Sequence, residues 1–264
     1  MNYSFMSFSC PEMNLKQLLQ TARRYGYAGI EPRLSAGHQH GIELDVSDVF
    51  LQEAWQMARD SNVSLCCLAT SCVFADPDQA QLNVDVARRT IEVAAKVHAP
   101  AIRVFGGRVP EHVSRETSLA CVADALGQLA DDAAQHRVTI CLETHDSWCD
   151  PVHVAAIMRQ VNHPFIAVNW DIMHPVLTAG ATVETAYTLL QHWIRHVHVH
   201  DGQYTDNKLV FKPIGEGLVD HKTAIRLLQE DEYTGFISGE WINWETYETH
   251  LPREIRKLQG FEIK

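Results

Sequence analysis

Apolar and polar residues alternate strictly between Arg195 and Asp201, in the order Arg-His-Val-His-Val-His-Asp. This alternation predicts a β-strand with two different faces, because successive side chains point to opposite sides of a sheet. Val197 and Val199 then lie on one face, and three imidazoles lie on the other. A solvated surface strand would explain one such histidine, but neutral imidazole is also the commonest metal ligand in proteins.

Three further apolar runs each end in a carboxylate. They are residues 138–143, 165–171 and 235–240, which close with Glu143, Asp171 and Glu240. A carboxylate at the end of a buried strand is costly unless it is paired, hydrogen-bonded or bound to a cation. Three carboxylates and one imidazole form a hard, oxygen-rich ligand set, which suits Mn²⁺ or Mg²⁺ better than a structural zinc site.

Helices are predicted between the strands, because apolar residues there recur at helical spacing. The first begins near Leu15 and ends at Gly26, and Ser114 is placed to cap a later one. Other helical patterns cover residues 46–60, 84–95, 119–133, 154–161, 183–191 and 245–258, and a turn is expected at 76–78. The remaining predicted strands are residues 3–9, 27–31, 63–69 and 100–105.

The predicted strands end at residues 8, 31, 69, 105, 143, 171, 200 and 240. Regular alternation of strand and helix predicts parallel strands, and eight such units have the size of a (β/α)₈ TIM barrel. We therefore expect an α/β fold with a single barrel domain over residues 1–264. The alternative is an open doubly wound sheet, which usually has a glycine-rich turn after its first strand; residues 8–13 contain no glycine.

Charged and imidazole side chains gather at the predicted strand ends. In a barrel, the C-terminal ends of the strands carry the catalytic groups. The residues at these ends are Glu31, Arg103, Glu143, Asp171, His198 and Glu240. Packing alone does not explain this convergence, so we expect these side chains to form one site.

The composition of the chain disfavours some classes of binding partner. The formal charge is −11 with no cluster of Lys or Arg, which disfavours nucleic acids and anionic membranes. No apolar run is long enough to span a membrane, and the N-terminal residues lack a basic segment followed by an apolar one, so we expect a soluble, unexported protein. The seven cysteines are an odd number without a CxxC pair, as in a reduced cytoplasmic protein. Oligomeric state is left open, and a homo-oligomer is compatible with the sequence.

Short motifs lie at or after the predicted strand ends. They are Gly29-Ile-Glu31, residues 102–107, Leu142-Glu-Thr-His145, Asp171-Ile-Met-His174, His196-Val-His198 with Asp201, Gly215-Glu-Gly217 and Gly239-Glu-Trp241. In these motifs the sequence resembles the sugar phosphate isomerase/epimerase superfamily of xylose-isomerase-like barrels, across essentially the whole chain. The resemblance implies one divalent cation, Mn²⁺ or Mg²⁺ with Zn²⁺ or Co²⁺ as alternatives, held by Glu143, Asp171, His198 and Glu240.

The resemblance also implies a metal-dependent isomerase or epimerase of a small polyhydroxylated sugar, ketose or keto-acid. Glu143 and Glu240 close the fifth and eighth strands, on opposite sides of a barrel mouth, so a substrate can sit between them. Two carboxylates flanking one carbon can remove a proton from one face and return it to another. Substrate contacts are expected from Glu31, Arg103, His145, His174, His200 and Trp241. For Arg103, an internal ion pair with Glu31 or Glu143 is an equally good interpretation.

Three alternatives compete with this interpretation, and the sequence argues against the second of them. A dehydratase of the 3-dehydroshikimate type shares Arg103, Glu143 with His145, Asp171 with His174, and Glu240, but it has Lys where this chain has His200. A type IV apurinic endonuclease adds histidines after the third and fourth strands for a trinuclear cluster, and residues 69–72 and 105–107 lack them. A non-catalytic sugar-binding barrel would not need the acid/base pair.

Overall fold

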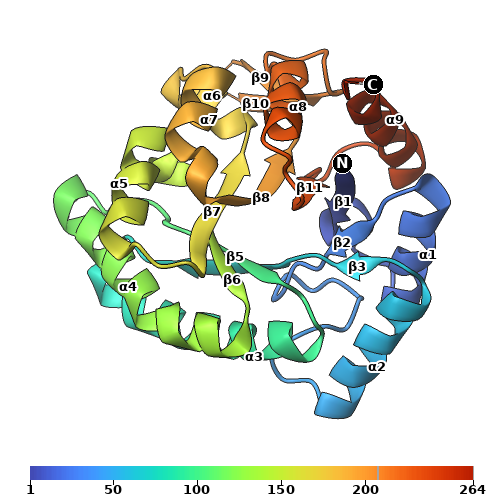
Figure 1. Ribbon diagram of the computed structural model, residues 1–264, viewed down its shortest axis with the longest axis horizontal. Coiled ribbons are helices and arrows are strands. Elements are labelled where there is room, and N and C mark those ends of the chain that lie inside the picture. Colours follow the sequence, from blue (N-terminus) through green and yellow to red (C-terminus); the bar gives the residue numbers. More distant parts are fainter. Residues whose placement is uncertain (207, 264) are drawn as a thin grey trace.

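Parallel strands form a nearly closed barrel inside a ring of helices, in a computed structural model that describes residues 1–206 and 208–263 (Figure 1). The strands of the barrel are β1 (Asn2–Met6), β2 (Gly29–Glu31), β3 (Ser64–Leu65), β4 (Leu68–Val73), β5 (Ala101–Phe105), β6 (Thr139–Glu143), β7 (Ile166–Asp171), β8 (Ile194–Val199) and β11 (Phe236–Gly239). Their order is β3-β2-β1-β11-β8-β7-β6-β5-β4, and every pairing between them is parallel. The predicted α/β TIM barrel is confirmed.

The two ends of this sheet are halves of one strand. β3 pairs with β2, and β4 pairs with β5, so the third strand changes partner at Cys66 and Cys67. Backbone hydrogen bonds from Cys66 to Ile30 and from Leu34 to Ala69 continue the β2 side and close the ring. The prediction of one continuous third strand ending at Ala69 is therefore wrong, because a switch of partner interrupts the regular ladder.

Helices cover the outside of the barrel (Figure 1). Within the described residues they are α1 (Leu15–Tyr25), α2 (Asp48–Asp60), α3 (Pro77–Lys96), α4 (Arg115–His136), α5 (Pro151–Val161), α6 (Met173–Ala179), α7 (Val183–Leu190), α8 (His221–Glu230) and α9 (Tyr247–Gln259). As predicted, the Ser114 hydroxyl caps α4 by accepting from the Thr117 backbone N–H, and α1 stops at Gly26, whose φ is 86°. The expected turn at residues 76–78 is instead the start of α3, with Asp76 as its cap and Pro77 in its first turn.

Two elements after the strand ends were not predicted. Helix α6 begins two residues after Asp171, and Pro175 in its first turn hides the helical pattern. A two-stranded antiparallel hairpin, β9 (Asp201–Thr205) and β10 (Lys208–Lys212), follows the histidine strand. Both lie in the loops at the C-terminal ends of β7 and β8, which are the loops that shape the mouth of a barrel.

Small apolar side chains fill the barrel at its N-terminal end. Cys66, Cys67, Ala101, Cys141 and Ala167 form this cluster, with the ring of Phe236 against it. The larger core lies between the outer faces of the strands and the helices. The polar inward-facing residues are thereby concentrated toward the C-terminal ends of the strands. No helix in the described part of the chain is long and apolar enough to cross a membrane.

Candidate active site and metal centre

Three carboxylates and one imidazole meet inside the barrel at the C-terminal ends of four strands. Ligand atoms of Glu143, Asp171, His198 and Glu240 all lie within 4.8 Å of one another. His198 Nδ1 is 3.2 Å from Glu240 Oε2 and 3.5 Å from Glu143 Oε1. The first three side chains are 0% exposed, and Glu240 is 6% exposed. Four of the six strand-end residues expected to converge therefore meet in one cluster.

Several polar atoms in this cluster have no hydrogen-bond partner among the described residues. They are the Nδ1 atom of His198 and both carboxylate oxygens of Glu143, of which Oε2 is in an ion pair with Arg103 but accepts no hydrogen bond. A buried polar atom without a partner costs free energy. A divalent cation can accept lone pairs from carboxylate oxygens and from an imidazole nitrogen at the same time. These four side chains therefore fit a divalent cation, and the oxygen-rich set does not resemble a closed zinc site of cysteines.

Partners outside the cluster orient two of its carboxylates. Arg103 Nε lies 3.0 Å from Glu143 Oε2. Asp171 Oδ2 lies 2.7 Å from His200 Nε2, while Asp171 Oδ1 accepts the backbone N–H groups of Met173 and His174 at 2.9 and 3.0 Å. Asp171 thus caps α6 with one oxygen and faces His200 with the other. This explains why α6 begins where it does.

The three histidines of β8 face the barrel interior, as the alternation predicts. His196, His198 and His200 are 1%, 0% and 3% exposed, and each lies beside a buried carboxylate. His196 and His198 both contact Glu31 through Nε2, whereas His200 contacts Asp171. The solvated surface strand is excluded.

The buried charged groups shift one another's pKa values. Burial alone would raise the pKa of Glu240, but the imidazoles of His198 and His200 and the Arg103 guanidinium lower it to about 2. Burial alone would lower the pKa of His145, but Asp146, whose Oδ2 is 3.2 Å from His145 Nδ1, and Glu143 raise it to about 9. A Glu240 carboxylate with this pKa is ionised at neutral pH, which is the form that binds a cation.

Arg103 forms the internal ion pair that the sequence left open. Its side chain is 1% exposed, its Nη1 donates to the Thr70 carbonyl at 2.8 Å, and the guanidinium carbon is 4.0 Å from the centroid of the Phe105 ring.

A second arginine, Arg33, lies close to Arg103 and was not singled out from the sequence. Burial and the nearby Arg103 guanidinium lower the pKa of Arg33 to about 10. Its position two residues after Glu31 was the only sequence signal.

His145 and His174 lie together at the mouth. Their ring centroids are 4.3 Å apart in an edge-on contact, and the ring of His174 is 5.4 Å from that of His200. Both line an open cavity of about 400 Å³ that also reaches Arg108 and Tyr204. This cavity adjoins the carboxylate cluster through His174. The mouth therefore has room for a small polar molecule beside the cluster.

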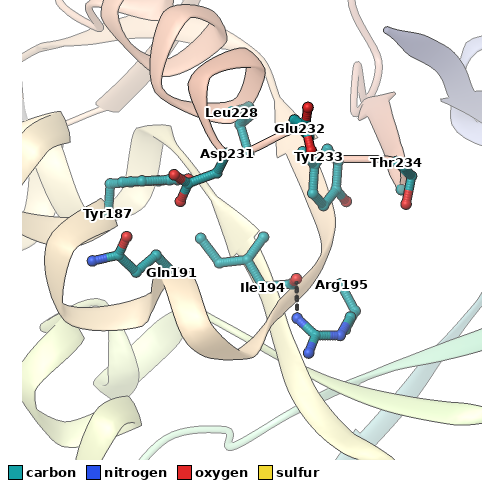
Figure 2. A pocket seen from close by; sticks show the side chains of 10 residues that line it. Tyr187, Gln191, Ile194, Arg195, Leu228, Asp231, Glu232, Tyr233 and Thr234 are labelled. Atoms are coloured by element: carbon teal, nitrogen blue, oxygen red, sulfur yellow. Dashed lines mark hydrogen bonds between the residues drawn. The ribbon is translucent and has the colours of Figure 1, made fainter.

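A second cavity, of about 420 Å³, lies at the opposite end of the barrel (Figure 2). Its wall includes Ile194 and Arg195, where β8 begins, and the Arg195 side chain donates to the Ile194 carbonyl at 2.8 Å. Tyr187 closes another side with its hydroxyl 2.5 Å from Asp231 Oδ2. None of the predicted site residues lines this cavity, so it is not the candidate active site.

Two residues expected to contact substrate are placed elsewhere. Glu31 is 0% exposed, and both of its oxygens face imidazoles on the side of His198 opposite Glu143 and Glu240. Trp241 is 1% exposed and packs between Gly239 and His250, because the residue after inward-facing Glu240 points out of the barrel. Neither side chain lines the cavity at the mouth, so a direct substrate contact of Glu31 or Trp241 stays a prediction that these contacts do not support.

Asp201 organises the loop after the hairpin and does not join the cluster. Its carboxylate accepts hydrogen bonds from the backbone N–H groups of Gly202, Gly215, Gly217 and Val219 at 2.9 to 3.2 Å, and the side chain is fully buried.

The substitution Asp201→Asn replaces one acceptor oxygen by an NH₂ donor that faces backbone N–H groups. We expect a loss of about 2–3 kcal/mol in the free energy of unfolding, measured by urea denaturation. A loss below about 0.5 kcal/mol would show that the loop does not depend on this carboxylate.

Comparison with known protein families identifies the family of this chain. The model of the xylose isomerase-like TIM barrel family matches residues 19–259. The chain belongs to this family. The resemblance drawn from the sequence motifs is therefore confirmed, and the xylose isomerase-like barrel has the arrangement of strands and helices described above. A search of curated protein sequences finds no match.

Solved structures share the same barrel at low sequence identity. The probable 3-DHS dehydratase AsbF of Bacillus anthracis has a TM-score of 0.83 and 19% identity, covering 98% of this chain and 99% of that one. IOLI protein with a bound zinc atom has a TM-score of 0.81 and 19% identity, covering 99% and 96%. The 3-keto-D-glucoside 4-epimerase YcjR of E. coli has a TM-score of 0.79 and 16% identity, covering 98% and 99%. At these identities the likeness concerns the fold alone.

Proposed function

We propose that this xylose isomerase-like barrel is a divalent-metal-dependent isomerase or epimerase of a small sugar, ketose or keto-acid. The observation that carries the proposal is the buried cluster of Glu143, Asp171, His198 and Glu240, whose ligand atoms converge within 4.8 Å, with the Glu143 oxygens and His198 Nδ1 lacking hydrogen-bond partners among the described residues. The likeness of fold to an epimerase and to a zinc-binding barrel supports it. A cytoplasmic location and a homo-oligomer stay predictions.

In this proposal, Glu143, Asp171, His198 and Glu240 hold one Mn²⁺ or Mg²⁺. The bound cation would polarise a substrate carbonyl and lower the cost of an enediolate. Glu143 and Glu240 lie on β6 and directly after β11, which β7 and β8 separate in the sheet. One carboxylate would remove a proton from the substrate carbon between them, and the other would return a proton to the same or the adjacent carbon. Arg103 would keep the Glu143 carboxylate in a fixed orientation during this transfer.

His174 and His145 would contact the substrate at the mouth. Their edge-on rings, beside the cavity of about 400 Å³, can hydrogen-bond hydroxyl groups of a polyhydroxylated molecule. In a dehydratase of the 3-dehydroshikimate type, which is the second candidate, the same pair would protonate a leaving hydroxyl. The likeness of fold to the probable 3-DHS dehydratase supports that alternative.

A turnover assay tests the proposal. The protein would be stripped with a chelator, reloaded with Mn²⁺ or Mg²⁺, and incubated with ketoses, keto-acids and 3-dehydroshikimate while NMR follows the products. We expect cation-dependent interconversion of isomers or epimers. Release of water with a conjugated chromophore would favour the dehydratase. Tight ligand binding without turnover of any compound would favour the non-catalytic sugar-binding barrel.

The kinetics of the Arg103→Lys variant distinguish an anionic substrate from a neutral one. A lysine ammonium is a point charge and does not reproduce the planar fork of a guanidinium. If Arg103 binds a substrate carboxylate or phosphate, we expect KM to rise by roughly ten-fold or more on the anionic substrate. If it acts only through Glu143, kcat should fall while KM changes little. The measurement compares both constants on an anionic and a neutral substrate of equal carbon number; unchanged kinetics on both would remove Arg103 from the site.

A further inference from the structure

We propose that Glu31 is a positioning residue, which holds the His198 imidazole with its Nδ1 atom turned toward the cation site, and that His196 holds Glu31. This inference rests on the proposed metal site, and it assigns a function to the histidine of the His196-Val-His198 pair that is not a ligand. Neither residue would touch the substrate.

The contact between Glu31 and the histidines crosses the barrel interior. Glu31 ends β2, and both histidines lie on β8, which β1 and β11 separate from β2 in the sheet. Glu31 Oε2 is 2.8 Å from His196 Nε2. His198 Nε2 is 3.1 and 3.2 Å from the two Glu31 oxygens. A buried carboxylate that reaches across the barrel to two imidazoles fixes the orientation of both.

The two nitrogens of the His198 ring have different surroundings. Nε2 faces the Glu31 carboxylate, whereas Nδ1 faces Glu143 and Glu240 and has no hydrogen-bond partner among the described residues. A carboxylate is an acceptor, so it places the ring proton on Nε2. The lone pair is then on Nδ1, where the other candidate ligands converge. Carboxylates that accept the second N–H of a ligating histidine in this way orient the ring and raise its basicity.

His196 completes the arrangement from the opposite side of the carboxylate. Its Nε2 contacts Oε2, the oxygen that also lies 3.2 Å from His198. Without this contact the Glu31 carboxylate could rotate about its last bond and leave Nε2 of His198. Glu31, Cys66 and His196 could also be read as a separate cation site, since their ligand atoms lie within 4.8 Å. However, the Cys66 thiol donates to the Ile30 carbonyl at 3.2 Å, so that group is already satisfied.

The test is the affinity of Glu31→Gln for Mn²⁺, measured by calorimetry on the chelator-stripped full chain. The amide keeps the size of the side chain but loses the second acceptor oxygen. We expect the Kd to rise by about 10- to 100-fold while one Mn²⁺ still binds per chain. Glu53→Gln is the matched control, since it removes the same charge from an exposed position on α2. A Glu31→Gln affinity within two-fold of the wild type, or an equal loss in Glu53→Gln, would overturn the proposal.

A second measurement does not need the variant to fold. In wild-type protein with ¹⁵N-labelled histidine and bound Zn²⁺, the nitrogen spectrum of His198 should show a protonated Nε2 and a metal-bound Nδ1. A metal-bound Nε2 would overturn the positioning role of Glu31. If the wild type binds neither Mn²⁺ nor Zn²⁺, the proposed function itself fails and this inference falls with it. Cation binding with an unchanged Glu31→Gln affinity overturns only the inference.

Discussion

Replacing His198 by alanine is expected to remove the bound cation and to lower turnover by on the order of 10³-fold or more. The imidazole is the only nitrogen ligand of the proposed set, and its Nδ1 lies within 3.5 Å of two of the carboxylates. Without it, three buried carboxylates face one another with less neutralising charge. Asp171→Asn should have a similar effect on the cation. Its amide oxygen can still accept the N–H groups that begin α6, so the fold should survive.

The measurements are the cation content by elemental analysis after dialysis, the kinetics, and the circular dichroism spectrum. His192→Ala is the matched control, because this exposed imidazole lies just before β8, at the other end of the strand from His198. The control should keep one cation per chain and full activity. One cation per chain in both His198→Ala and Asp171→Asn would rule out the ligand assignment.

The second large effect is expected at the acid/base pair. If Glu143 and Glu240 transfer protons at the substrate carbon, reaction in D₂O should introduce deuterium at one substrate carbon. Glu143→Gln and Glu240→Gln should each lower kcat by about 10²- to 10⁴-fold, because an amide cannot carry the proton. Each variant also loses a charged ligand, so cation content must be measured beside the rate. NMR of the recovered substrate and product shows the position of the label.

The position of exchange distinguishes the two carboxylates. A variant that still exchanges the substrate proton with solvent but forms no product has lost the group that returns the proton. A variant without exchange has lost the group that removes it. Full conversion by the wild type without any solvent label would contradict proton transfer by this pair and would favour hydride transfer or complete internal return.

The periodicity of the sequence was sufficient to predict the barrel, because apolar runs alternate with helical patterns at a regular spacing. The strands β2, β6, β7, β8 and β11 also end at or next to a carboxylate or an imidazole. Glu143, Asp171, His198 and Glu240 could be expected to meet because the C-terminal ends of parallel strands share one rim. The hairpin of β9 and β10 and the short α6 were missed, since the loops of a barrel follow no period.

The orientation of individual side chains was harder to predict from the sequence. Glu31 lies at a strand end like the four proposed ligands, yet its carboxylate contacts His196 and His198 on the far side of the ring. This depends on the curvature of the barrel across β1 and β11, which the sequence pattern does not contain. Trp241 could have been placed correctly, because the residue after an inward-facing one in a strand points outward.

The most direct test of the account is the position of a cation in crystals soaked in Mn²⁺, located by anomalous scattering. We predict one strong peak among Glu143, Asp171, His198 Nδ1 and Glu240, about 2.0–2.3 Å from an atom of each. A peak at either of two other clusters, Asp171 with His174 and His200 or Glu31 with Cys66 and His196, would contradict the proposed centre. So would the absence of any peak inside the barrel.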